Sequence, residues 1–149
     1  MNPPPLESTG DPWRKDRDQI KLLAVFHFIL GAFMLLGIAF LFLHYSLMNL
    51  FFLKPEMWKL QANAPMPPMP PQAFFEIMLW FYLFAGAILT LGFALNTLSG
   101  FCLWRRKHRL FSLVIGGLNC LQVPFGTALG VFTLIILFRD SVRQLYEET

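Results

Sequence analysis

The chain has 149 residues, of which 56% are hydrophobic and only 14% are charged, with a formal net charge of +3. An average soluble chain carries roughly 25% charged residues, and so short a chain cannot bury this much apolar surface in water. The composition therefore excludes a soluble globular domain, a disordered polar chain and a disulfide-stapled secreted domain, and it predicts a membrane protein.

The first predicted element is a disordered cytoplasmic tail over residues 1–19. This segment is rich in proline, and its basic and acidic residues balance one another. Terminal segments of this kind are poorly ordered unless other parts of the chain hold them.

A first transmembrane helix is predicted over residues 20–46. Residues 22–43 carry no charge, and His27 is their only strongly polar member. At a rise of 1.5 Å per residue this stretch reaches about 33 Å, against a hydrocarbon thickness of about 30 Å. A signal peptide would have a shorter apolar region followed by a small-residue cleavage site, so we expect an uncleaved spanning helix.

Residues 47–72 are predicted to form the one sizeable external loop. Residues 47–53 are too apolar for water, and we expect them on the membrane surface, with Tyr45 and Trp58 in the headgroup zone. Residues 64–71 contain five prolines, which remove backbone donors and favour polyproline II. This part is expected to be a stiff spacer leading to the next helix.

A second transmembrane helix is predicted over 73–104, and a third charge-free stretch, 110–138, allows two structures. It forms either one helix kinked at Pro124 or two helices, 107–122 and 125–143, joined by a tight turn around Pro124. Lys and Arg near membrane ends prefer the cytoplasmic side. A hairpin places ten of the 12 cations on one side, whereas a single kinked span places eight there, so the charges favour the hairpin.

The predicted fold is therefore all-α, an integral membrane bundle of four transmembrane helices with both termini cytoplasmic. The alternative is three helices, the last kinked at Pro124. Residues 20–146 would form a single transmembrane helical domain, and 147–149 the end of a cytoplasmic tail.

Two polar residues in the predicted spans are candidate intramembrane sites. His27 is the only ionisable residue deep in an apolar span, and such residues often mark proton or ion paths. It shares a helix face with Ala24 and Gly31, so it is also expected to point into the bundle as a neutral hydrogen-bonding residue. Asn119, together with Gln122, is predicted to bind backbone groups freed around Pro124.

Soft metal ligands gather in and beside the external loop. Thioethers and imidazole suit copper(I), although methionines also fill gaps between apolar side chains. The residues concerned are His44, Met48, Met57, Met66 and Met69.

Glycines recur at helical spacing, where they allow helix backbones to approach closely in lipid. They are expected to pack the helices of one chain, and the same pattern also serves a homo-oligomer or a membrane-protein partner. The predicted packing positions are Gly31, Gly86, Gly116, Gly126 and Gly130.

A concentrated basic loop follows the second predicted span, and its cations are Arg105, Arg106, Lys107 and Arg109. It is predicted to be a topogenic signal, with attraction to anionic lipid headgroups as the alternative. Nucleic-acid binding needs a larger basic face. The sequence shows no nucleophile–base set, phosphate loop or zinc spacing, so neither an enzyme nor a cofactor is predicted.

Both ends of the chain resemble small bacterial multi-pass membrane proteins of uncharacterised role. The C-terminal match is Pro124-Phe125-Gly126-Thr127-Ala128-Leu129-Gly130 with the apolar helix that follows, and the N-terminal match runs from Asp18 to Gly31. The resemblance implies an inner-membrane location and no particular reaction.

The predicted function is a non-enzymatic structural or modulator subunit, embedded in the lipid bilayer. The alternatives are a small transporter or proton-handling protein that uses His27, and a periplasmic copper(I) handler that uses His44 and the loop methionines.

Overall fold

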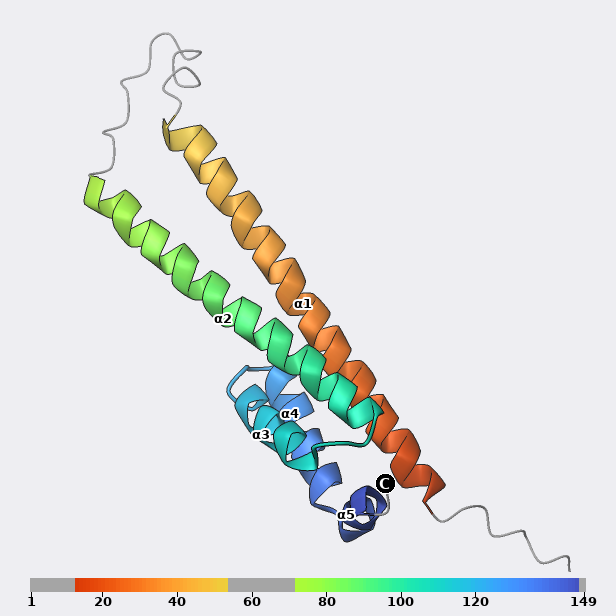
Figure 1. Ribbon diagram of the computed structural model, residues 1–149. Coiled ribbons are helices and arrows are strands. Elements are labelled where there is room, and N and C mark those ends of the chain that lie inside the picture. The colour runs from red at the N-terminus through yellow and green to blue at the C-terminus, as the bar shows by residue number, and fades with distance from the viewer. Residues whose placement is uncertain (1–12, 54–71, 148–149) are drawn as a thin grey trace, which may run out of the picture. The chain divides into compact units, whose positions relative to one another are not determined.

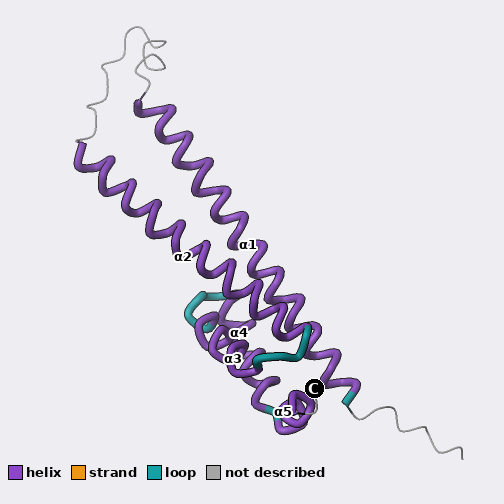
Figure 2. The backbone as a smooth tube through the Cα atoms, viewed as in Figure 1, coloured by secondary structure: helices purple, strands orange, loops and turns teal. Residues whose placement is uncertain are grey.

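The computed structural model describes residues 13–53 and 72–147, which form helices joined by turns, with no strand in these ranges (Figures 1 and 2). Five helices follow one another in the sequence: α1 (Arg14–Leu53), α2 (Gln72–Trp104), α3 (Arg109–Asn119), α4 (Phe125–Phe138) and α5 (Asp140–Glu147). The predicted all-helical fold is confirmed.

Two helices are long and apolar enough to cross a membrane, α1 over Arg14–Leu50 and α2 over Phe75–Trp104. A third candidate exists only if α4 and α5 are taken as one span, and these two are bent by 70° relative to each other. The membrane character predicted from the sequence is confirmed at this level. The predicted bundle of four transmembrane helices is not confirmed, because α3 has only 11 residues and α4 only 14.

The surface of the described residues is far more apolar than that of a soluble protein, and several polar residues lie inside. Polar residues are buried, among them Asp16, His27, Asn96, Ser99, Ser112, Asn119 and Thr133. Large apolar side chains such as Phe42 and Trp80 are instead more than 70% exposed. Apolar patches of this extent are rare on soluble monomers, whereas lipid accepts them without cost.

Helix boundaries differ from the predicted ones at both ends of α1. Residues 14–19 are helical rather than part of a disordered tail, and buried Asp16 accepts a hydrogen bond from Arg139 Nη1 at 2.9 Å. Residues 47–53 continue α1, so they are not part of an external loop. The rest of that loop, residues 54–71, lies outside the described residues.

The predicted last helix, 125–143, is divided in two. Arg139 has an extended backbone with ψ of 134°, which ends α4 at Phe138 and starts α5 at Asp140. The chain therefore leaves the axis of α4 before the predicted end of the helix.

The chain divides into two units. Unit 1 comprises the described residues up to Gly31 and from Ala94, and unit 2 comprises Ala32–Phe93. The apolar core of unit 1 draws on α1, α2, α4 and α5, with Ile20, Leu23, Ala24, Leu103, Leu129, Leu137, Val142 and Leu145. In unit 2, segments of α1 and α2 run antiparallel, with Gly37 facing Leu89 and His44 facing Tyr82.

Helices α3 and α4 form a hairpin within unit 1, and Figure 1 shows them side by side. Glycine permits their close approach, because a Cβ atom at Gly130 would lie 2.4 Å from the Gly116 carbonyl oxygen. A Cβ atom at Gly116 would lie 2.9 Å from Thr133 Cγ2. The chain thus forms two separate helices here rather than one helix kinked at Pro124.

Candidate functional site

A reciprocal amide pair joins α2 to α3 in the interior of unit 1. Asn96 Nδ2 donates to Asn119 Oδ1 at 3.2 Å, and Asn119 Nδ2 donates to Asn96 Oδ1 at 2.8 Å. Both residues are only 1% exposed. Hydrogen bonds between helices in lipid contribute about 1 kcal/mol each, so this pair fixes the register of the two helices.

Asn119 was expected to bind backbone groups near Pro124, and its side chain instead pairs with Asn96. Thr127 serves the turn: its Oγ1 donates to the Cys120 carbonyl at 2.9 Å, and its backbone N–H donates to the Gln122 carbonyl at 3.0 Å. One sequence feature could have predicted the amide pair: each of two charge-free segments contains an asparagine. Asparagine side chains on different helices tend to form hydrogen bonds with each other in an apolar medium.

His27 is fully buried on the inner stripe of α1. Its Nδ1 lies 3.0 Å from the Leu23 carbonyl oxygen. Because a carbonyl only accepts, Nδ1 carries the proton, and Nε2 is left as an acceptor with no partner among the described residues. The hydroxyls of Ser99 and Ser112 are also buried without a partner in the described chain. The His27 ring is thus bonded only through Nδ1 to its own helix, and the described residues supply no next member for a proton relay.

An aromatic cluster in unit 2 lies between the C-terminal part of α1 and the N-terminal part of α2. His44 Nδ1 and the Tyr82 hydroxyl are hydrogen-bonded, and the rings of Tyr45 and Tyr82 meet edge to face with centroids 5.3 Å apart. Beside it is an open groove of about 210 Å³. The groove is lined by Tyr45, Met48, Asn49, Phe75, Glu76, Met78 and Leu79.

The copper(I) hypothesis concerns this same region. His44 is engaged by Tyr82, and Met48 lines the groove. Met57, Met66 and Met69 lie outside the described residues. Within residues 13–53 and 72–147 no group of three or more His, Cys, Asp or Glu side chains is placed to hold a metal ion.

The basic loop between α2 and α3 contains two residues in left-handed backbone conformations, Arg106 with φ of 52° and His108 with φ of 53°. Such values are uncommon for residues other than glycine. The Arg105 guanidinium lies over the Phe101 ring, 4.2 Å from its centroid. The loop therefore has a defined backbone conformation, in which the chain reverses direction between α2 and α3.

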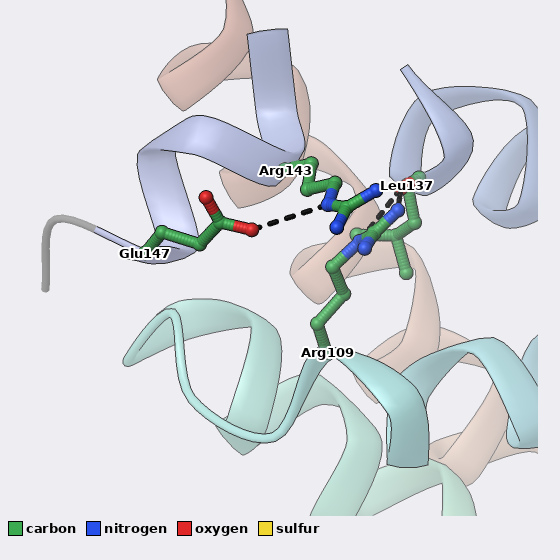
Figure 3. Close-up of polar contacts among 4 residues, drawn as sticks. All are labelled: Arg109, Leu137, Arg143 and Glu147. Atoms are coloured by element: carbon green, nitrogen blue, oxygen red, sulfur yellow. Dashed lines mark hydrogen bonds and ion pairs between the residues drawn. The ribbon is translucent and has the colours of Figure 1, made fainter. Parts of the chain in front are cut away.

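Arg109 makes a contact that the sequence did not predict, because there it is only one cation of the basic loop. Its Nε donates to the Leu137 carbonyl oxygen at 2.8 Å, and its Nη2 donates to the same atom (Figure 3). This carbonyl belongs to the last turn of α4, where backbone acceptors lack helical partners. Arg109 thereby ties the start of α3 to the end of α4.

The glycines predicted to pack helices occupy different surroundings. Gly116, Gly126 and Gly130 each have a neighbour closer than 3.0 Å to an added Cβ atom, and Gly31 is buried in unit 1. An added Cβ atom at Gly86 would meet nothing within 4 Å. Gly86 therefore marks an open position on α2.

No protein-family model, curated protein or solved structure matches the chain. The resemblance of the two ends to bacterial multi-pass proteins stays a prediction. The described residues thus form an all-helical chain with two or three helices long and apolar enough to span a membrane, and several of its polar side chains are buried between helices.

Proposed function

We propose that the chain is a non-enzymatic membrane subunit that binds another transmembrane helix through the face of α2 that carries Gly86. The partner helix belongs to a different membrane protein or to a second copy of the chain. The observation that carries this proposal is the open position at Gly86, in a chain where most described glycines have a close neighbour.

Close backbone approach is a main source of helix association in lipid, because lipid provides no hydrophobic drive between helices. Thr90 follows Gly86 by four residues, and its hydroxyl donates to the Gly86 carbonyl at 2.7 Å. A hydroxyl bonded to its own helix adds little to the surface, so this face stays flat enough for a second backbone. The exposed side chains around it are apolar, as a partner within the membrane requires.

A photo-crosslinking amino acid placed on either side of α2 tests the proposal. Leu83 lies three residues before Gly86, on the same face of the helix, whereas Phe84 lies on the opposite side. Both are exposed, 55% and 68% respectively. We expect a discrete protein adduct from position 83 and only lipid adducts from position 84.

Gly86→Ile in the same experiment should abolish the adduct from position 83, and Gly117→Ile is the matched control. An added Cβ atom at Gly117 also meets nothing within 4 Å, but this glycine lies on α3. Adducts of equal yield at positions 83 and 84, or their absence at both, would contradict the proposal.

We also infer that both termini are cytoplasmic and that the membrane is the bacterial inner membrane. Support comes from the ten cations that a hairpin at 110–138 leaves on one side. A reporter that works only in the cytoplasm should be active when it is fused after Thr149. Activity of a reporter that works only in the periplasm at that position would show the opposite orientation.

A further inference from the structure

The hairpin of α3 and α4 is too short to cross a membrane twice. Helix α3 has 11 residues and α4 has 14, which correspond to lengths of about 16 and 21 Å. The hydrocarbon core is about 30 Å thick. Either helix, started at one border, ends near the middle of the bilayer or a little beyond it.

The two open ends of the hairpin are held at one level and flanked by cations. Arg109 at the start of α3 binds the Leu137 carbonyl at the end of α4 (Figure 3). Three cations, Arg105, Arg106 and Lys107, precede α3, and Arg139 follows α4. Cations of this kind lie at the aqueous border of a membrane, so both ends of the hairpin belong to the same border.

The tip of the hairpin is apolar and uncovered. Leu121, Val123 and Phe125 are 80%, 82% and 81% exposed, and residues 110–138 contain no charged side chain. A turn exposed to water on the far side of the membrane would not be expected to expose three large apolar side chains together. A tip surrounded by acyl chains requires them.

The turn provides some of its own hydrogen bonds, which lipid cannot supply. Thr127 binds the carbonyl oxygens of Cys120 and Gln122, and the Gln122 N–H donates to the Asn119 carbonyl at 2.9 Å. Pro124 has no N–H to satisfy. Backbone at membrane depth needs partners within the protein, and these bonds supply them for part of the turn.

Beyond the hairpin the chain turns aside. Helix α5 is bent by 70° from α4, buries Val142 and Leu145, and exposes an ion pair between Arg143 and Glu147 at 3.1 Å (Figure 3). The apolar face of α5 packs on the core of unit 1 and its charged face stays exposed, so the chain does not continue through the bilayer along the axis of α4.

We propose that α3 and α4 form a re-entrant hairpin, which enters and leaves the membrane at the border marked by the basic loop and holds Leu121, Val123 and Phe125 among acyl chains near the bilayer centre. This inference does not depend on a partner at Gly86.

A matched pair of arginine substitutions tests the depth of the tip. Leu110 at the base is 77% exposed and Val123 at the tip is 82% exposed, so neither substitution disturbs a packed contact. The reporter is the native thiol of Cys120, in a Cys102→Ala background reconstituted into intact vesicles. Its rate of reaction with a membrane-impermeant maleimide measures how often this thiol, which lies near Gly130 in the hairpin, reaches water.

Val123→Arg should raise this rate on the order of a hundredfold, because an arginine near the bilayer centre is strongly disfavoured. Leu110→Arg should leave the rate within about threefold of the parent, since a long side chain at the base reaches water. Equal effects of the two substitutions, or rapid labelling of the parent protein, would overturn the proposal.

A second measurement distinguishes the two ways in which the proposal could fail. Val123→Cys and, independently, Phe125→Cys are made in a chain with Cys102 and Cys120 replaced by Ala, and Lys107→Cys marks the base. The tip thiols should react from neither side of intact vesicles and react fully in detergent. Labelling from the side opposite Lys107→Cys would show a spanning hairpin, and labelling from the same side would show a hairpin outside the membrane.

Discussion

Unit 1 and unit 2 use the same kinds of residue in different ways. In unit 1, Gly130 lies against the backbone of Gly116, and Asn96 is paired with Asn119. In unit 2, Gly86 faces open space, and Asn49 lines an open groove while its side chain binds the Tyr45 carbonyl of its own helix at 2.9 Å.

The difference shows which residues carry information about packing in this chain. Apolar side chains are exposed in both units, so hydrophobicity does not distinguish a helix face that meets the chain itself from one that meets its surroundings. Small and polar residues do distinguish them, because lipid gives helices no other reason to associate. Gly116, Gly130 and the asparagine pair of unit 1 have their contacts within the chain, whereas Gly86 and Asn49 of unit 2 lie at open positions.

The largest effect that would test this comparison is expected from Gly130→Ala. The added Cβ atom would lie 2.4 Å from the Gly116 carbonyl oxygen and 2.8 Å from the Cys120 backbone nitrogen, so backbone rather than a mobile side chain would have to move. We expect the free energy of unfolding in mild detergent to fall by about 3 kcal/mol, the upper range for an overpacked interior.

Gly117→Ala is the control, since it adds the same methyl group to the same hairpin at a position with no neighbour within 4 Å. It should leave stability unchanged or raise it slightly, because alanine favours helix more than glycine does. Similar losses in the two variants would show that the hairpin is not closely packed.

An intermediate effect is expected at the amide pair. Asn96→Leu leaves the Asn119 amide buried without its partner and should cost about 1–2 kcal/mol, as should Asn119→Leu. The double variant should cost clearly less than the sum of the two, because neither amide is then left without the other. A double-mutant cycle measured by unfolding gives the coupling energy, and strictly additive losses would mean that the pair does not stabilise unit 1.

The smallest effect is expected from His27→Leu. The substitution replaces a buried ring whose Nε2 has no described partner by an apolar side chain, so stability should stay the same or rise by up to about 1 kcal/mol. Proton flux into vesicles that hold the protein should not change. A loss of flux in this variant would revive the proton-handling hypothesis and give unit 1 a role beyond packing.

Charge-free length was sufficient to predict the long helices α1 and α2 and the all-helical fold, and Pro124 indicated the turn between α3 and α4. The positive-inside rule could not distinguish a spanning hairpin from a re-entrant one, because both return Arg139 and Arg143 to the same side. The helix lengths and the exposed apolar tip are the observations on which the proposal of a re-entrant hairpin rests.

The features that sequence reasoning missed depend on partners far along the chain. Arg109 contacts Leu137, 28 residues later, and Arg139 contacts Asp16, which is 123 residues earlier. These contacts accompany the end of α4 before Arg139 and the start of α1 at Arg14, and no local sequence pattern predicts them. Tertiary contacts such as these routinely override local helix propensity.

The contact between Asp16 and Arg139 has a consequence for biosynthesis. Asp16 leaves the ribosome long before Arg139 exists, so α1 enters its surroundings with this acidic group still without its partner. Until Arg139 emerges, water, headgroups or the insertion machinery must shield the Asp16 carboxylate. The first and last parts of the message are thus translated far apart in time, although their products contact each other in the folded chain. Premature termination before Arg139 would leave Asp16 of the first helix without its hydrogen-bond partner.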